Sequence, residues 1–447
     1  MSPVASRRVL VAILLVYVVL GVLYAVETPA WQAPDEPAHY NYIRHIAETG
    51  RLPVLREGDF PSDYMEEIKA RRFPPEMPVD PLRYEAHQPP LYYLLGAGVY
   101  RLAGWLGAPA LLALRLLTLA LGTLALVAGY EAVRLAFPGA PAVALGAVAL
   151  AATLPMHVAT SAAVNNDALV EALLAIIAWR LLVASREGWT VRRALGIGAL
   201  LGLAILTKMQ SYVALALAVL ALYHAATEGT FSPRRLTRRH LRMGGAMLGV
   251  AALCALPWLA RNATVYGLGD PLALGRHALV VEGQPTSGEY IAEHGIVALG
   301  TAFVRTTFRS FWGQFGWMGV LLDERIYLAL AVVTALVAAG FLLYLTRRTR
   351  PADPAAGGPP APAPIAAWLG VAWVAVTCLG YLWWNTQYLQ HQGRYLFPAL
   401  LPIGVGFVLG LREILHRSVR VTGALLAVPA VGLLAWGAAI GDPPIYA

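Results

Sequence analysis

Residues 34–40 read PDEPAHY and follow directly on an apolar run at residues 9–26. That run is long enough to span a membrane, and no small-residue cleavage site follows it cleanly, so we expect a retained first helix. Two adjacent carboxylates, Asp35 and Glu36, and the imidazole of His39 therefore lie close to a lipid surface. Acidic groups near lipid cost free energy unless they are paired or used. This loop is the first candidate for a functional site.

The rest of the chain has the composition of a polytopic membrane protein. Of its 447 residues 58% are hydrophobic and 13% charged, whereas ordinary soluble domains have about 25% charged residues. Recurring apolar runs predict an all-α fold with about eleven membrane spans, of which the two near 193–225 are short. We expect the spans near residues 9–26, 109–130, 141–157, 168–184, 193–207, 211–225, 243–259, 326–345, 366–383, 395–412 and 419–438.

The positions of the arginines predict how the chain is oriented in the membrane and whether a short apolar segment at residues 89–106 crosses it. If that segment does not cross the membrane, the basic residues beside the apolar runs all fall on the side of Arg7 and Arg8. If it crosses, all of them face outward, against the positive-inside rule. We therefore expect a cytoplasmic N-terminus and a surface or re-entrant helix at 89–106. The net charge of +8 then reflects cytoplasmic loops, and no nucleic-acid partner is expected.

A single transmembrane domain over residues 1–447 is expected, with two large extracytoplasmic loops at 27–88 and 260–325. The segment 346–365 is rich in Pro, Ala and Gly and predicts a flexible cytoplasmic linker. No internal repeat of the kind that pairs transporter halves is evident.

The first loop is expected to begin with an amphipathic helix. Asp35 is a good N-cap and Gly50 a C-terminal stop. Ile43 and Ile46 share one face, so this helix could lie along the membrane surface. Asp35 and the adjacent Glu36 point about 100° apart on a helix, so one can act as general base while the other binds or orients.

Four further polar residues are expected on the same outer face. They are Asp167 at the start of a span, Lys208 at a break between two short spans, Arg261 after the seventh span and Arg394 before the tenth. Each has a plain structural explanation: an N-cap for Asp167, a snorkelling side chain for Lys208, lipid contacts for the arginines. Their convergence on one face predicts an extracytoplasmic site for an anionic lipid, because lysine and arginine bind phosphate well.

Metal and disulfide chemistry have little support in the sequence. The two cysteines, Cys254 and Cys378, lie inside apolar runs, which argues against a disulfide framework or a zinc site. No ligand spacing requires a divalent metal or another cofactor.

The chain resembles the GT-C membrane glycosyltransferases, which include the protein O-mannosyltransferases and the lipid A aminoarabinose transferases. The resemblance covers nearly the whole chain in the order of its motifs, although each motif is short. The motifs are DEP at 35–37, YEAHQPPLYY at 84–93, NDAL at 166–169, LTK at 206–208 and GRYLFP at 393–398.

This resemblance implies sugar transfer from a polyprenyl-phosphate donor to an envelope lipid, glycan or protein, on the outer face of a prokaryotic plasma membrane. Asp35 would be the general base of an inverting reaction, and Asp167 matches the second acidic position. Relatives often carry a basic residue directly before the Pro-Pro pair, where this chain has Gln88 with His87 one place earlier. Some relatives also have a large soluble C-terminal domain that is missing here, so acceptor recognition is expected from the loops.

The chemistry of such a donor needs a base for the acceptor and cations for the departing phosphate. Asp35 supplies the base, and Lys208 and Arg394, with Arg261 as a further candidate, supply the cations. The expected substrate-binding residues are Glu36, His39, His87, Gln88, Asp167, Lys208, Arg261 and Arg394. Two other readings stay open: a transporter or flippase of lipid-linked sugars, which would place charges at the bilayer midplane, and a non-catalytic assembly protein.

Overall fold

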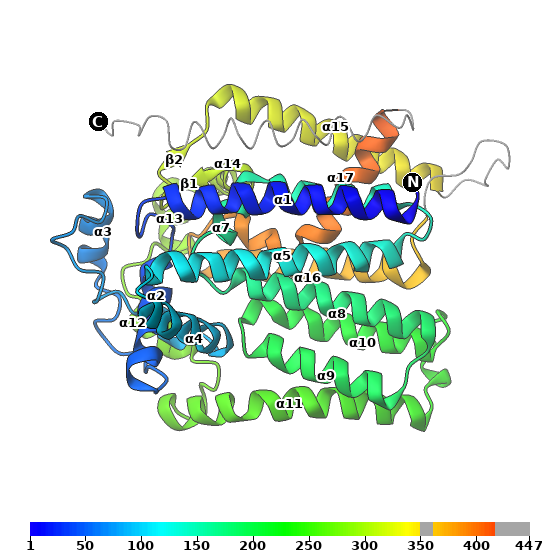
Figure 1. Ribbon diagram of the computed structural model, residues 1–447, viewed down its shortest axis with the longest axis horizontal. Coiled ribbons are helices and arrows are strands. Elements are labelled where there is room, and N and C mark those ends of the chain that lie inside the picture. Colours follow the sequence, from blue (N-terminus) through cyan, green and yellow to red (C-terminus); the bar gives the residue numbers. More distant parts are fainter. Residues whose placement is uncertain (349–360, 416–447) are drawn as a thin grey trace.

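The computed structural model describes residues 1–348 and 361–415, and its long helices run side by side as one bundle (Figure 1). The fold is almost entirely α-helical, as the apolar runs predict. The long helices are α1 (Pro3–Glu27), α5 (Ala110–Ala136), α8 (Asp167–Glu187), α10 (Val213–Ala226), α11 (Arg238–Tyr266), α15 (Glu324–Arg348), α16 (Pro364–Gln387) and α17 (Leu400–Ile414).

Eight helices in the described part are long and apolar enough to cross a membrane. Here α10 and α17 are counted together with the short 3-10 turns η2 (Met209–Tyr212) and η4 (Gly393–Ala399) that precede them. A bent pair, α6 (Pro141–Thr153) and α7 (Pro155–Ser161), kinks by 69° and would make a ninth span. The helix α9 (Val191–Ile205) occupies the predicted span at 193–207 but has only 15 residues.

The predicted count of about eleven spans is therefore not confirmed. The last expected span, 419–438, lies outside the described residues, as does the centre of the predicted linker at 349–360.

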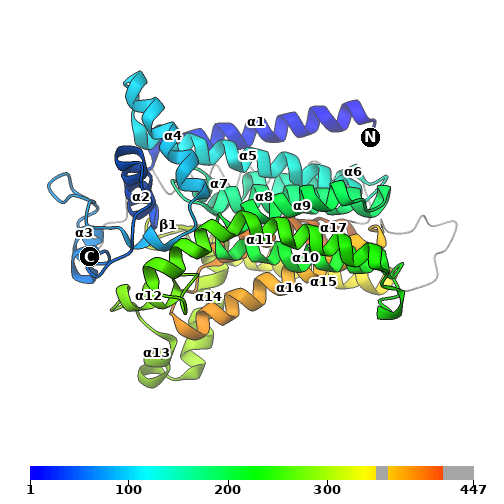
Figure 2. The same cartoon turned by 90° about the horizontal axis from the view of Figure 1, so that it is seen from below.

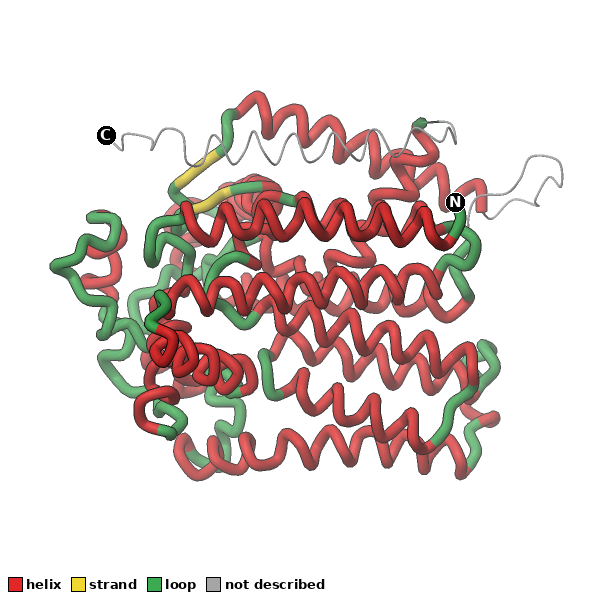
Figure 3. Tube along the Cα trace, in the orientation of Figure 1, coloured by secondary structure: helices red, strands yellow, loops and turns green. Residues whose placement is uncertain are grey.

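Loops and short helices gather at one end of the bundle, opposite the N-terminus (Figures 1 and 3). They come from the two loops expected to be extracytoplasmic and from the segment 89–106. The short elements there are α2 (Glu36–Thr49), α3 (Ser62–Ala70), η1 (Tyr84–His87), α4 (Leu91–Leu106), α12 (Leu274–Val280), α13 (Ser287–His294) and α14 (Ile296–Trp312). A hairpin of β1 (Gln314–Phe315) and β2 (Val320–Leu321) pairs antiparallel, with Gln314 opposite Leu321.

The helix α4 runs crosswise to α1 and α5 at this end (Figure 2). It is not among the helices that are long and apolar enough to span a membrane. This orientation agrees with a surface or re-entrant helix, while its position relative to the lipid stays a prediction.

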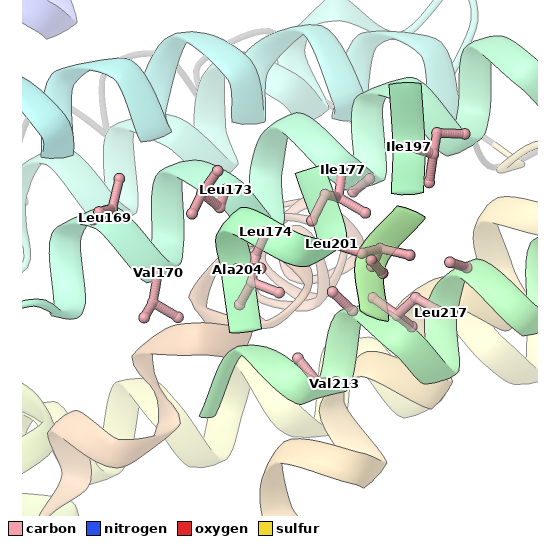
Figure 4. Close-up of a cluster of buried hydrophobic side chains, with 14 of the residues drawn as sticks. Leu169, Val170, Leu173, Leu174, Ile177, Ile197, Leu201, Ala204, Val213 and Leu217 are labelled. Carbon is pink, nitrogen blue, oxygen red and sulfur yellow. The ribbon is translucent and has the colours of Figure 1, made fainter. Parts of the chain in front are cut away.

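The core is built from small and branched apolar side chains on α8, α9 and α10 (Figure 4). Glycines let helices approach closely where lipid offers no hydrophobic driving force. At Gly198 of α9, a Cβ would lie 2.3 Å from the carbonyl oxygen of Met247 on α11. Any larger side chain there would push these two helices apart.

Candidate active site

A cavity of about 390 Å³ lies at the loop-rich end of the bundle. Its walls come from the first loop, the ends of α8, α10, α11 and α16, and the second loop. Seven of the residues predicted from the sequence line it: Asp35, His39, His87, Gln88, Asp167, Lys208 and Arg394. Segments up to 359 residues apart in sequence thus meet here, as in the contact between Asp35 and Arg394.

Asp35 occupies the N-cap position of α2, yet its side chain makes no capping hydrogen bond. Its backbone is left-handed, with φ of 68°, a conformation that is uncommon outside glycine, asparagine and aspartate. The carboxylate instead accepts hydrogen bonds from Arg394 Nη2 at 2.6 Å and from the Tyr84 hydroxyl at 2.9 Å. The Asp35 side chain therefore does not cap α2 as expected; it lines the cavity instead.

The acidity of Asp35 is set by opposing effects. Burial by itself raises the pKa of this carboxyl, but the charges of Arg394 and His39 and the hydrogen bonds from Arg394 and Tyr84 outweigh it. The net result is a pKa below the usual range of an aspartate. Without a ligand, Asp35 is thus an ionised and tightly paired carboxylate.

A second ion pair joins Asp167 to Lys208, with Asp167 Oδ1 2.5 Å from Lys208 Nζ. Asp167 is the first residue of α8, and the preceding Asn166 donates from Nδ2 to the carbonyl of Thr207 at 3.2 Å. This hydrogen bond ties the start of α8 to the break that carries Lys208. Two carboxylates and two cations of the cavity lining are therefore paired one to one.

His39 lines the cavity and is almost completely buried. Its Nδ1 lies 2.8 Å from the hydroxyl of Tyr93, and the two rings stack with centroids 5.8 Å apart. Burial lowers the pKa of His39 against the raising effect of Glu85 and Asp35.

His87 and Gln88 line the cavity next to the Pro-Pro pair. His87 Nδ1 donates to the carbonyl of Tyr84 at 2.9 Å, and its ring centroid lies 4.3 Å from that of His277. Burial lowers the pKa of His87 to about 4 and that of His277 to about 3. The position before the Pro-Pro pair thus supplies the neutral amide of Gln88, with a neutral imidazole before it.

Two predicted binding residues do not line the cavity. Glu36 is completely buried, and both of its carboxylate oxygens bind Arg115 of α5, at 2.8 and 2.6 Å. Arg261 donates to the carbonyl of Pro53 at 2.5 Å and to Asn262 Oδ1 at 2.9 Å. Both side chains are therefore bound within the protein, Glu36 away from the cavity and Arg261 beside Trp258 of its wall.

Several residues of the lining were not proposed from the sequence. The most telling is Glu85, whose pKa burial raises and whose Oε2 is sealed off without a hydrogen-bond partner. Glu85 lies two residues before His87 in the same motif, and its place in that motif is the signal from which it could have been predicted as a site residue. Tyr84 and Tyr395 also lie in the quoted motifs, whereas no motif pointed to the other polar and aromatic residues: His277, Gln284, Trp384 and Gln390.

Within residues 1–348 and 361–415, no three His, Cys, Asp or Glu side chains converge as they would around a metal ion. Each of the two lining cations, Lys208 and Arg394, is paired with an aspartate, and an anionic ligand can take the place of that carboxylate.

A family model described as dolichyl-phosphate-mannose-protein mannosyltransferase matches residues 87–260. No curated protein matches the sequence at a significant level. Among solved structures, the oligosaccharyltransferase of Archaeoglobus fulgidus tethered with an acceptor peptide is similar over 97% of this chain and 54% of that one. The TM-score is 0.53 at 14% identity. The same enzyme in complex with Zn and sulfate matches with a TM-score of 0.52 at 14% identity, over 96% and 51% of the two chains.

ArnT from Cupriavidus metallidurans bound to undecaprenyl phosphate is also similar, at 17% identity over 93% of this chain and 79% of that one. Its TM-score of 0.42 is too low to argue from. The chain spans about half the length of the archaeal structures. At these identities the likeness concerns the fold.

Proposed function

We propose that this chain is a membrane glycosyltransferase of the GT-C superfamily, which moves a sugar from a polyprenyl-phosphate donor to an envelope acceptor. One observation carries the proposal. Two carboxylates and two cations pair across a cavity at the ends of apolar helices, where a lipid phosphate and an acceptor hydroxyl can meet. The description of the matching family model, which names a dolichyl-phosphate sugar, supports this donor class.

Arg394 and Lys208 are assigned to the donor phosphate. The departing polyprenyl phosphate gains negative charge as its bond to the sugar breaks, and cations in a water-poor cavity stabilise that charge strongly. Arg394 is 8% exposed, and its Nε is fixed by Gln392 Oε1 at 2.7 Å, so its guanidinium is held in place.

Asp35 is assigned as the general base. The acceptor hydroxyl oxygen bonds to the anomeric carbon of the sugar from the side opposite the phosphate, which inverts the configuration. The carbon–oxygen bond to the phosphate breaks, its electron pair stays on the phosphate oxygen, and the hydroxyl proton passes to Asp35.

Donor binding would also prepare the base. In the free protein Arg394 holds the Asp35 carboxylate. A donor phosphate that binds Arg394 competes for this guanidinium, so the pKa of Asp35 rises toward the range that a base needs. Activation would therefore follow donor binding.

The side of the membrane rests on the distribution of arginines. Ala108 and Ala140 lie at opposite ends of α5, so cysteines placed there report orientation. Ala108→Cys should react with an impermeant thiol reagent from outside and Ala140→Cys should not. The reverse pattern would place the cavity in the cytoplasm.

The proposal is tested with purified protein in lipid vesicles, a short-chain polyprenyl-phosphate sugar with a labelled sugar, and an envelope extract as acceptor source. Expected is release of free polyprenyl phosphate with label in an envelope component. Movement of intact labelled lipid between leaflets, without loss of its sugar, would indicate the flippase reading instead.

A further inference from the structure

Two chemically different sets of side chains line the cavity. One set, called the charged half, consists of the ion pairs Asp35–Arg394 and Asp167–Lys208. The other, called the neutral half, comes from η1, the second loop, the end of α16 and the short loop that follows α16. Its residues are His87, His277, Gln284, Trp384 and Gln390.

Gln390 organises the neutral half. Its Oε1 accepts hydrogen bonds from Trp384 Nε1 at 2.9 Å and from the Tyr395 hydroxyl at 2.7 Å. Its Nε2 donates to Gln284 Oε1 at 3.3 Å. The hydrogen bond from Nε1 to Gln390 thus holds the indole ring of Trp384 in one orientation.

The two histidines offer hydrogen-bonding groups that the protein does not use. Because His87 Nδ1 carries the proton given to the Tyr84 carbonyl, Nε2 of the neutral ring is an acceptor, and it has no partner among the described residues. The ring nitrogens of His277 likewise have no hydrogen bond within the described part of the chain. The His277 ring centroid lies 4.3 Å from that of His87 and 6.4 Å from that of Trp384.

We propose that His87, His277, Trp384 and Gln390 form a sugar subsite that selects an uncharged sugar. The inference rests on the proposed function, because it assigns the phosphate of the donor to the charged half and its sugar to the neutral half. Neutral imidazoles both donate and accept, which matches hydroxyl groups. An indole ring of fixed orientation offers an apolar face to the C–H groups of a pyranose or furanose ring.

The charges of the lining argue against a charged sugar. An amino sugar needs a carboxylate without a cation, and within the described lining Asp35 and Asp167 are both paired. Glu85 is the remaining carboxylate of the lining; its Oε2 is buried without a hydrogen-bond partner, and burial raises its pKa, which favours its uncharged form. An acidic sugar would find no lysine or arginine among the residues of the neutral half, and Lys208, whose charge reaches His87, is already paired with Asp167. A Glu85 variant therefore distinguishes a site for an amino sugar from a site for an uncharged sugar.

The test is a binding competition with the full-length protein in lipid vesicles. The probes are short-chain polyprenyl phosphate without sugar, and the same lipid carrying a neutral hexose, an amino sugar or a uronic acid. The neutral donor should bind at least about tenfold more tightly than either charged donor, as expected for two or more additional hydrogen bonds.

Variants test which residues cause the preference for the neutral donor. His277→Ala and Trp384→Ala should lose the advantage of the neutral donor but keep the affinity for polyprenyl phosphate alone. His294→Ala, on the exposed end of α13, is the matched histidine control and should change neither.

The inference is overturned if the amino-sugar donor binds most tightly and Glu85→Gln abolishes that binding, and equally if His277→Ala and Trp384→Ala leave the preference intact. Failure of polyprenyl phosphate itself to bind the native protein would remove the proposed function, a result distinct from a wrong sugar class.

Discussion

Asp35 and Glu36 are adjacent acidic residues, each paired with an arginine, yet they have opposite environments. Glu36 is completely buried and bonds Arg115 through both oxygens. Asp35 lines the cavity and bonds Arg394 through one oxygen, with Tyr84 on the other. The Glu36–Arg115 pair is inaccessible and connects parts of the fold. The Asp35–Arg394 pair lines the cavity, where a ligand can replace one partner.

The Glu36–Arg115 pair joins the parts that carry the site. Glu36 also accepts hydrogen bonds from the backbone N–H of Trp31 at 3.2 Å and of Val164 at 3.1 Å. The guanidinium of Arg115 donates in addition to three carbonyls at the end of α1 and beyond it, those of Ala25, Thr28 and Pro29. The loop before Asp35 and the turn before Asp167 are therefore anchored to α5 by one fully bonded pair.

The largest effect is expected from breaking this anchor. Arg115→Ala leaves the Glu36 carboxylate buried without a counter-charge, which costs about 3–5 kcal/mol. Thermal unfolding in detergent should show a large loss of stability or no folded protein. Arg134→Ala on the same helix removes only an exposed pair with Glu131 and should cost less than about 1 kcal/mol. Equal stability of the two variants would refute the anchoring role.

A smaller effect is expected from removing the cations of the cavity. Arg394→Ala and Lys208→Ala should each weaken binding of a polyprenyl-phosphate sugar by about ten- to a hundredfold, the cost of one charge-assisted hydrogen bond. Lys69, the other lysine of the chain, pairs with Glu66 on α3 and provides a matched control. Donor affinity that is unchanged in both cavity variants would remove these residues from the phosphate site.

The smallest effect is expected at Tyr84. Its hydroxyl lowers the pKa of Asp35 by hydrogen bonding, so Tyr84→Phe should raise that pKa. A base works in its ionised form, and the acid limb of the turnover profile should therefore move to higher pH. The loss at neutral pH should stay within about tenfold, the value of one hydrogen bond. An acid limb that moves to lower pH would contradict this account of Asp35.

Composition and short motifs predict much of this molecule. The all-α bundle, the crosswise helix near 89–106 and seven of the lining residues follow from apolar runs, arginine placement and a few motif residues. The motif residues lie at the ends of apolar helices, and the position of a helix end can be predicted from the local sequence. The number of spans is less certain, because α9 is short and α6 and α7 form a bent pair.

The pairing of charges could not be predicted in the same way. Asp35 has the sequence of an N-cap, and only the left-handed backbone at that residue turns its carboxylate toward Arg394. Glu36 has the sequence of a site residue, but its partner Arg115 lies 79 residues away inside an apolar run. His277 and Gln390 of the neutral half lie in the second loop and in the short loop after α16, where no periodic sequence pattern predicts their positions.

Asp35→Asn tests the central claim most directly, because it separates binding from chemistry at the residue assigned as base. Asparagine has nearly the same shape and tolerates a left-handed backbone, but it cannot accept the proton and cannot hold Arg394 by charge. Donor affinity should therefore be equal to that of the native protein or higher, since the guanidinium is free for the phosphate. Transfer should fall by about a hundredfold or more. Near-normal transfer by Asp35→Asn, with the protein folded and donor bound, would contradict the account.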